Sequence, residues 1–250
     1  MMKRMLATGA AAAALAAAAF GAAPVHADTT TAIAPGTAIW VGDDHTGESK
    51  VCTLGFIGRD LASNKAAAVT AGHCAVGGGV GDRVITRDGR AELGHVVRVV
   101  SDPKGDDIAL IRFDGEDAPA EVDTAVPVAD GRSLPVLGVL TPELANATRP
   151  AICKTGITTG ITCGAPDSDV QFDDGSYVSV EGLKGDAGDS GAGMYVRAAD
   201  GTGVYALGVL KGSVGLGDAV GTSLSKYAKL WGVDFRSPGQ PTVQQASLPG

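Results

Sequence analysis

The sequence predicts an all-β protein. Short apolar and β-branched runs recur along the chain, and little of it shows the 3.6-residue period of a helix. Turn-forming pairs such as Asp88-Gly89 separate the runs. The chain has 37 glycines among 250 residues, which suits many tight turns. Short strands at even spacing with turns between them are typical of a β-barrel or a β-sandwich.

The first 27 residues have the pattern of a signal peptide and are not expected in the fold. Lys3 and Arg4 give a positive start, the stretch 6–23 is apolar, and residue 27 ends a small-residue cleavage pattern. The mature chain would begin at Asp28. No later apolar run is long enough to cross a bilayer, so we expect a secreted, extracellular protein without a membrane partner.

The charge balance disfavours nucleic acid as a partner. Cleavage after residue 27 removes two of the 20 basic residues and none of the 28 acidic ones, so the net charge changes from −8 to −10. A strongly acidic surface repels a polyanion. It fits a soluble extracellular protein and leaves the substrate open.

Two sets of strands are expected, with a connector between them. The first set covers residues 38–41, 51–58, 66–70, 83–86, 93–100 and 108–113. Residues 114–134 are acidic and weakly periodic, which indicates a connector. The second set covers residues 136–140, 151–155, 157–163, 170–172, 177–180, 193–196, 204–210 and 219–222.

The end of the chain has a helical pattern followed by a polar tail. Leu224, Tyr227 and Trp231 fall at positions i, i+3 and i+7, which predicts a helix over residues 223–231 that packs on the second set of strands. Residues 237–250 include three prolines and no apolar pattern, so we expect a disordered tail there.

A glycine-rich stretch around Ser190 is the first candidate for chemistry. It reads Gly-Asp-Ala-Gly-Asp-Ser-Gly-Ala-Gly over residues 185–193. A serine hydroxyl needs a base to take its proton and donors to hold an oxyanion, and a glycine-rich turn can supply backbone N–H groups. Taken alone, the stretch is also compatible with an ordinary surface turn.

A base and an acid with matching patterns precede this serine. His73 ends the run Thr-Ala-Gly-His before Cys74, directly after an apolar stretch. Asp107 opens the apolar run Asp-Ile-Ala-Leu-Ile, and we prefer it to Asp106, which ends a polar stretch. The imidazole N–H would satisfy the buried carboxylate, which in return would fix the tautomer of the base.

With these motifs in the order His73, Asp107, Ser190, the chain resembles the chymotrypsin/trypsin-like serine protease superfamily. The stretch 153–164, Cys-Lys-Thr-Gly-Ile-Thr-Thr-Gly-Ile-Thr-Cys-Gly, is similar to the secreted bacterial branch of streptogrisin and α-lytic type. The resemblance runs from about Val51 to Phe235. It implies two six-stranded antiparallel β-barrels with a short C-terminal helix. Residues 28–120 would form the barrel with the base and the acid, and residues 121–236 the barrel with the serine and the helix.

The resemblance also implies roles for residues around the serine. The backbone N–H groups of Gly188 and Ser190 would form the oxyanion hole. Asp189 would be buried and paired with an internal cation, and Lys154 occupies the position of that cation. The family more often has arginine there, which can bind a carboxylate through two donors, whereas lysine is a point charge.

Four cysteines in an exported protein indicate two disulfides, for which three pairings are possible. The pairing of Cys52 with Cys74 and Cys153 with Cys163 is the most local, and it matches the bacterial branch that the chain resembles.

The specificity pocket is where the chain departs from the family. Members of the bacterial branch usually have a cysteine of a third disulfide shortly before the serine motif, and Lys184 stands at about that position. They also have a serine on the strand that pairs with the substrate, and Lys211 stands near that position, followed by Gly212 and Ser213. If both lysines face the pocket, an acidic residue before the cut bond would be preferred. If they extend to solvent instead, a small apolar pocket would remain.

Together these features predict a secreted serine endopeptidase that acts on polypeptides through an acyl-enzyme intermediate. We expect a monomer without metal or cofactor, because no His, Cys or Asp cluster has ligand spacing. Two alternatives remain: an exported binding protein that keeps the protease fold without turnover, and an esterase that uses the same three residues.

Overall fold

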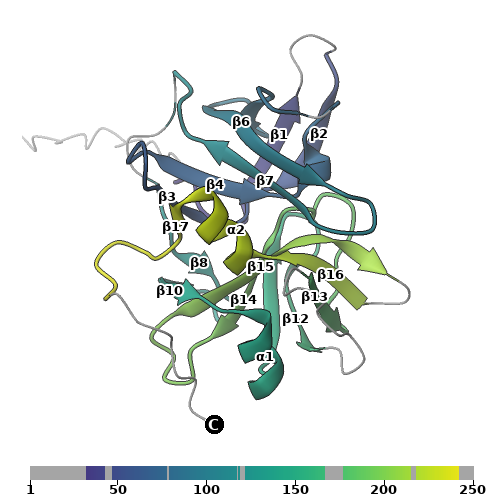
Figure 1. Cartoon of the computed structure of the whole chain (residues 1–250), viewed down its shortest axis with the longest axis vertical. Helices are drawn as coiled ribbons and strands as arrows, with labels where there is room; N and C mark the ends of the chain where they lie inside the picture. Colours follow the sequence, from purple (N-terminus) through teal and green to yellow (C-terminus); the bar gives the residue numbers. More distant parts are fainter. Residues whose placement is uncertain are drawn as a thin grey trace, which may run out of the picture. The chain divides into compact units, whose positions relative to one another are not determined.

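The structure is a computed structural model that describes residues 32–42, 47–77, 79–116, 118, 122–166, 177–214 and 218–241. Strands dominate these residues, and they form two large sheets (Figure 1). The first sheet has the strand order β17-β3-β4-β7-β6-β5-β1-β2, with antiparallel pairing throughout. Its strands are β1 (Ala38–Gly42), β2 (Ser49–Thr53), β3 (Ile57–Asp60), β4 (Ala66–Thr70), β5 (Arg83–Thr86), β6 (Glu92–Ser101), β7 (Asp107–Arg112) and β17 (Val233–Asp234).

The second sheet closes on itself. It has the order β10-β15-β14-β11-β12-β13-β16, and an additional β15–β16 pairing joins six of the strands into a ring, while β10 lies outside the ring, parallel to β15. Its strands are β10 (Val136–Val139), β11 (Ile152–Gly156), β12 (Gly160–Pro166), β13 (Tyr177–Glu181), β14 (Gly193–Arg197), β15 (Val204–Val214) and β16 (Asp218–Ser223). The expected connector contains the small pair β8 (Val126–Pro127) and β9 (Ser133–Leu134). The prediction of an all-β, two-barrel fold is confirmed.

The first sheet has eight strands, whereas six were expected. The run predicted as one strand over 51–58 is divided into β2 and β3 around Gly55. A Cβ at Gly55 would lie 2.7 Å from the carbonyl oxygen of Gly191 and 2.8 Å from that of Val69. Only glycine allows this close approach of three backbone segments, and the chain turns there from one pairing to the next. The other added strand, β17, comes from the C-terminal part of the chain and pairs with β3.

The predicted C-terminal helix is confirmed as α2 (Leu224–Trp231), which ends at Gly232 with a φ of +66°. A second helix, α1 (Pro142–Thr148), was not predicted. The side chain of Thr141 accepts a hydrogen bond from the N–H of Leu144, and Pro142 occupies the first turn. Threonine before proline is a helix-start signal, but the segment is too short to show a helical period.

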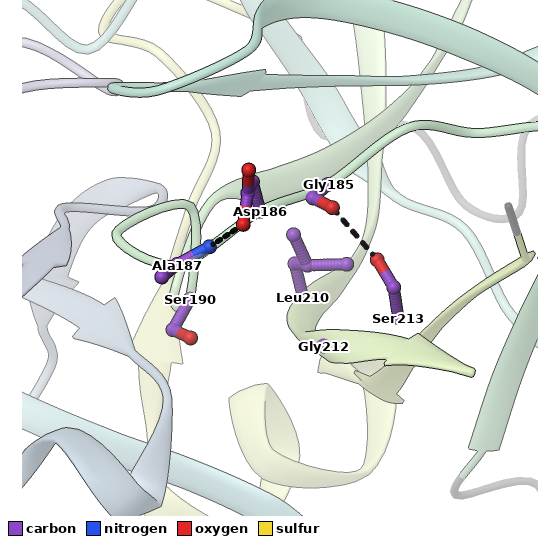
Figure 2. Close-up of a pocket in the computed structure, with 7 residues that line it drawn as sticks. All are labelled: Gly185, Asp186, Ala187, Ser190, Leu210, Gly212 and Ser213. Carbon is purple, nitrogen blue, oxygen red and sulfur yellow. Dashed lines mark hydrogen bonds between the residues drawn. The ribbon is translucent and has the colours of Figure 1, made fainter. Parts of the chain in front are cut away.

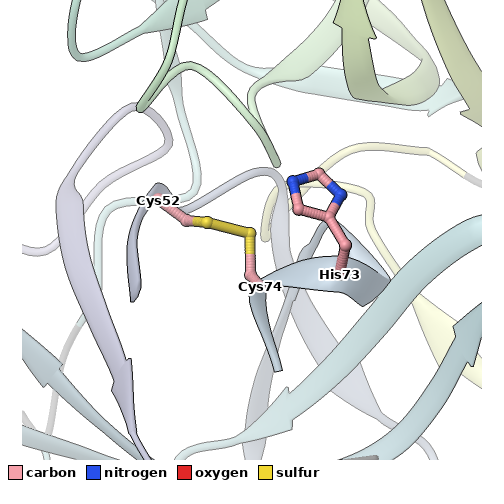
Figure 3. Close-up of side chains that lie close together, drawn as sticks. All are labelled: Cys52, His73 and Cys74. Atoms are coloured by element: carbon pink, nitrogen blue, oxygen red, sulfur yellow. A yellow bond between two sulfur atoms is a disulfide. The ribbon is translucent and has the colours of Figure 1, made fainter. Parts of the chain in front are cut away.

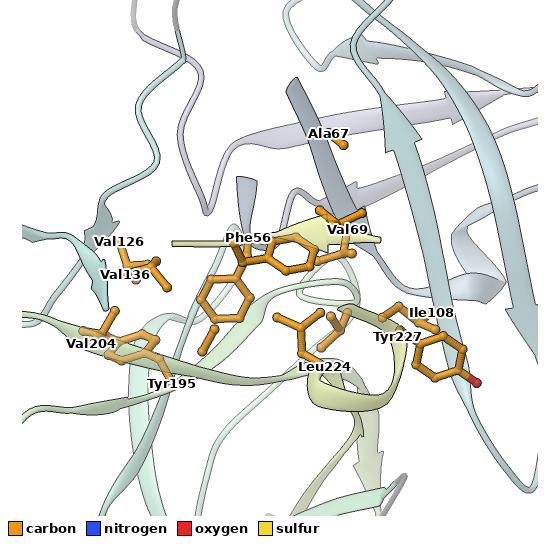
Figure 4. Packing of buried hydrophobic residues seen from close by; sticks show 14 of the residues in the cluster. Phe56, Ala67, Val69, Ile108, Val126, Val136, Tyr195, Val204, Leu224 and Tyr227 are labelled. Atoms are coloured by element: carbon orange, nitrogen blue, oxygen red, sulfur yellow. The ribbon is translucent and has the colours of Figure 1, made fainter. Parts of the chain in front are cut away.

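One buried apolar cluster contains residues of both sheets (Figure 4). Phe56 and Ile108 come from the first half of the chain, Tyr195 from β14, and Leu224 and Tyr227 from α2. Phe56, Ile108 and Leu224 have no solvent exposure. The helix therefore packs in the region where the two sheets meet, which is also where the candidate catalytic residues lie.

Several predictions concern residues outside the described part of the chain. They are the signal peptide over 1–27, the strand over 170–172, the boundary between residues 120 and 121, and the part of the expected tail from residue 242 onward. The tail was expected to begin at residue 237, but Ser237 is buried and exchanges two hydrogen bonds with Val136, so the ordered chain continues past this point. Within the described residues, neither helix is long and apolar enough to cross a membrane.

Candidate active site

His73 and Asp107 are in direct contact. His73 lies in the short 3-10 helix η1 (Gly72–Cys74) after β4, and Asp107 is the first residue of β7. The Nδ1 atom of His73 lies 2.5 Å from Oδ2 of Asp107, and the backbone N–H of His73 donates to Oδ1 at 2.7 Å. The Asp107 side chain is 1% exposed, whereas that of His73 is 41% exposed. With Nδ1–H directed at the carboxylate, Nε2 is left to accept a proton.

Two neighbouring residues make this contact possible. A Cβ at Gly72 would lie 1.9 Å from the carbonyl oxygen of Val100, so only glycine lets η1 approach β6 this closely. The backbone N–H of Asp107 donates to Oγ1 of Thr222, on β16, at 2.7 Å. The backbone of Asp107 is therefore held by the second sheet as well as by the first.

Asp106, the alternative acid, points elsewhere. Its Oδ2 atom accepts hydrogen bonds from Nζ of Lys226 at 2.8 Å and from Oη of Tyr227 at 2.5 Å. Both partners lie on α2. Asp106 is thus a contact between the β6–β7 turn and the helix, while Asp107 faces the imidazole.

Ser190 lies in a tight turn that is bound to the end of β2. Gly188 and Gly191 have φ values of +97° and +92°, a region that favours glycine. Thr53 donates its backbone N–H to the carbonyl of Ser190 and its hydroxyl to the carbonyl of Gly188, both at 2.8 Å. Among the described residues, the N–H groups of Gly188 and Ser190 donate to no acceptor. Two backbone donors are therefore open at the serine.

The turn with Ser190 and the helical turn with His73 are joined through a disulfide. Cys52, next to Thr53, is bonded to Cys74, the residue after His73 (Figure 3). The second disulfide joins Cys153 and Cys163 across β11 and β12, and the predicted pairing is confirmed. The sulfur atoms of the first bridge and a ring nitrogen of His73 lie within 4.8 Å of one another. Because both sulfurs are in a disulfide, this group has only the imidazole as a metal donor.

Asp189 forms a fully buried ion pair with Lys154. The Nζ–Oδ2 distance is 3.1 Å and neither side chain is exposed. Lys154 also donates to the hydroxyl of Thr159 and to the carbonyl of Gly160, so all three of its N–H groups have acceptors. Burial raises the pKa of Asp189, but hydrogen bonds from Thr159 and Thr158 and the charge of Lys154 outweigh it and lower the pKa. Burial lowers the pKa of Lys154, and Asp189 opposes this effect.

A pocket of about 290 Å³ lies beside Ser190 (Figure 2). One wall is the segment before the serine and the other is β15. The hydroxyl of Ser213 donates to the carbonyl of Gly185 at 3.0 Å and joins the two walls. The lining residues are Gly185, Asp186, Ala187, Ser190, Leu210, Gly212 and Ser213.

The two lysines expected in this pocket do not line it. The Lys184 side chain is exposed, and its backbone carbonyl accepts hydrogen bonds from the hydroxyls of Thr159 and Thr162. The Nζ atom of Lys211 donates to three carbonyls of the β6–β7 turn instead. A long, flexible side chain can reach acceptors on either side of a strand, so strand position alone did not determine its direction. Among the lining residues the ionisable group is the carboxylate of Asp186.

The sequence matches no family model. Two curated relatives, the uncharacterized proteins Rv1815 and MT1863 of Mycobacterium tuberculosis, are each 31% identical over 185 residues, which cover 72% of this chain and 76% of the relative. Nocardiopsis protease (NAPase) is similar in structure, with a TM-score of 0.62, 25% identity, and coverage of 82% of this chain and 99% of that one. Thermobifida fusca Protease A has a TM-score of 0.60, 23% identity, and coverage of 82% and 98%.

The chain belongs to the family of Rv1815, within the bacterial branch of the chymotrypsin-like serine protease superfamily.

The pocket beside Ser190 differs from the one expected from the sequence. Asp186, Leu210 and Ser213 are among the residues that line it, and neither Lys184 nor Lys211 is. An acidic side chain that entered the pocket would meet the like charge of Asp186. The structure therefore gives no support to the expected preference for acidic residues, which rested on Lys184 and Lys211.

Sequence reasoning missed several residues that hold the candidate site together. Thr53 holds the serine turn, Thr222 holds Asp107, and Thr158 and Thr159 donate to Asp189. Threonine at a strand end has no distinctive pattern, because the same residue type is common on any strand. The only local signal is the Thr-Thr pair at residues 158–159, between Cys153 and Cys163, and such a pair also suits an ordinary turn.

Proposed function

We propose that this protein is a secreted serine endopeptidase in which Ser190 is the nucleophile, His73 the general base and Asp107 the orienting acid. The observation that carries the proposal is the two-point contact of His73 with the buried carboxylate of Asp107. A structural histidine does not need a buried carboxylate on Nδ1. A general base does, because the carboxylate fixes its tautomer and stabilises the imidazolium that forms.

The reaction would proceed in two halves. The Ser190 oxygen attacks the scissile carbonyl carbon while its proton moves to Nε2 of His73. The tetrahedral intermediate then collapses, the C–N bond breaks, and the imidazolium gives its proton to the leaving amine. Water attacks the resulting ester in the same way and releases the acid.

The open N–H groups of Gly188 and Ser190 would hold the oxyanion of each tetrahedral intermediate. Such donors act on charge that develops in the transition state, and losing one costs about 10²- to 10³-fold in rate. Their direction depends on the Asp189 carboxylate, which accepts N–H groups of the hairpin turn at residues 158–159 and of Asp186 in its own segment. The buried ion pair of Asp189 and Lys154 would thus help to hold these two N–H groups in position.

The pocket favours a neutral side chain before the cut bond. Leu210 gives it an apolar wall, Gly212 adds no side chain, and Ser213 closes it by its bond to Gly185. The carboxylate of Asp186 disfavours an acidic side chain. The superfamily supports polypeptide as the substrate, and the two disulfides support an oxidising extracellular location.

The test is active-site labelling followed by substrate profiling. The protein without residues 1–27 is treated with a fluorophosphonate, which labels an activated serine with loss of fluoride, and labelling is compared with that of Ser190→Ala. Peptide and ester substrates are then assayed in parallel. Labelling at Ser190 together with peptide cleavage supports the endopeptidase. Labelling with ester cleavage alone would make the protein an esterase, and absence of labelling would favour a non-catalytic binding protein.

A further inference from the structure

The turn between β6 and β7 is bound to β15 by the ammonium group of Lys211. Nζ of Lys211 donates to the carbonyl of Asp102 at 2.7 Å, and to those of Pro103 and Gly105 at 2.9 Å each. An ammonium has three N–H donors, so these three acceptors use all of them. The turn lies in the first sheet, and Lys211 lies on β15 of the second.

This turn leads directly to the acid of the candidate site. Asp102 donates its N–H to the carbonyl of Asp106 at 2.8 Å, and Asp107 is the next residue. Asp106 is bound to Lys226 and Tyr227 of α2. Lys211 therefore binds the turn at residues 102–105. The helix α2 binds the next residue, Asp106, and β16 binds Asp107.

Lys211 also stands between two residues of the pocket wall. Leu210 and Gly212 line the pocket next to Ser190, and the Lys211 side chain leaves the strand toward the turn instead. One residue therefore links the strand that would bind the substrate to the turn that carries Asp107. A loose turn would let the carboxylate move relative to the imidazole, and a displacement of about 1 Å can cost on the order of 10²-fold in rate.

We propose that Lys211 is a positioning residue that holds Asp107 against His73 by fixing the β6–β7 turn, and that it does not bind the substrate side chain. The inference rests on the proposed protease function. It gives Lys211 a role in the rate of the chemical step and none in the choice of substrate.

The experiment compares three variants with the wild type. Lys211→Met keeps most of the length and apolar stem but removes the donors. Lys211→Arg keeps a positive charge and several donors. Lys104→Met removes an exposed ammonium from the same turn and serves as the control for charge, because the Lys104 side chain forms no hydrogen bond or ion pair with another described residue.

Three sets of measurements are made: kcat and KM on matched peptides with Leu or Glu before the cut bond, the rate of fluorophosphonate labelling, and hydrogen exchange of the backbone amides of residues 102 and 104–107. Lys211→Met should lower kcat by about ten- to a hundredfold on both peptides, with little change in KM. Labelling should slow in parallel and exchange in the turn should become faster. Lys211→Arg should restore part of the rate, and Lys104→Met should behave as wild type.

Three results would overturn the proposal: equal kcat values for Lys211→Met and Lys104→Met, a loss confined to KM on the Glu peptide, or unchanged hydrogen exchange in the turn. If the wild type neither labels nor cleaves, the protease function fails. Hydrogen exchange then still decides whether Lys211 holds the turn.

Discussion

At the scale of single residues, Asp189 and Lys154 form a buried ion pair whose partners depend on each other. Removing one charge leaves the other buried without compensation, which costs about 3–5 kcal/mol. Asp189→Asn should lower the free energy of unfolding by that amount near pH 7, measured by urea titration. A change below about 1 kcal/mol would mean that solvent reaches the pair.

The same pair predicts a pH dependence of stability. The pKa of Asp189 is lowered in the folded protein. A lowered carboxyl pKa stabilises the fold above the unfolded-state value of about 3.9, and this contribution is lost as the pH falls below that value through the folded pKa. The wild type should therefore lose more stability than Asp189→Asn when the pH falls from 5 to 3. Parallel curves of unfolding free energy against pH would contradict this assignment.

Thr222 holds Asp107 through its hydroxyl, and its side chain is buried. Thr222→Val keeps the shape but leaves the buried N–H of Asp107 without an acceptor, which costs about 1–3 kcal/mol. We expect this loss in the free energy of unfolding, together with a lower kcat on peptides. Thr202→Val, on the exposed turn before β15, is a control that should leave both quantities nearly unchanged.

At the scale of elements, α2 packs between the sheets through one face. Leu224 is fully buried, whereas Leu230 on the same helix is 68% exposed. Leu224→Ala should cost about 2–5 kcal/mol because it leaves a cavity. Leu230→Ala removes the same atoms from an exposed position, where no cavity forms, and should therefore change the midpoint of thermal unfolding little. Equal effects of the two variants would rule out the packing described for α2.

The two disulfides close short segments, and the chain-entropy model assigns each about 3 kcal/mol. Replacing Cys52 and Cys74 by alanine should also reduce activity, because Cys74 follows His73 and Cys52 precedes Thr53. Replacing Cys153 and Cys163 should reduce stability by a similar amount. This second replacement should change the acylation rate less than the first, because backbone hydrogen bonds between β11 and β12 still hold the two strands together. Peptide mapping of the unreduced protein checks the pairing first.

At the scale of the whole molecule, the two sheets should unfold together. One apolar cluster contains residues of both, and hydrogen bonds cross between them at Thr53, Asp107 and Lys211. Neither sheet can open without exposing this shared core. Calorimetry should show one transition whose calorimetric and van't Hoff enthalpies agree. Two separate transitions would show that the sheets are independent folding units.

The sequence by itself determined the features that depend on residues close together in the chain. Short apolar runs between turn signals predicted the strands, the stripe of Leu224 and Tyr227 predicted α2, and short contiguous motifs selected His73, Asp107 and Ser190. The four cysteines left three pairings open, and the structure contains the most local one, which the resemblance to the bacterial branch also implies. Each of these signals is strong because backbone geometry and chemistry restrict which residue types can occupy a few neighbouring positions.

Only the tertiary structure decided which distant groups meet. The strand predicted over 51–58 is divided in two because two other backbone segments approach Gly55. No pattern in the neighbouring residues indicates that approach. Thr222 reaches Asp107 across 115 positions, and Lys211 reaches Gly105 across 106. A lysine side chain has four rotatable bonds and can extend to any acceptor within several ångströms. Its direction therefore depends on where the fold places carbonyl groups, and the sequence near Lys211 does not contain that information.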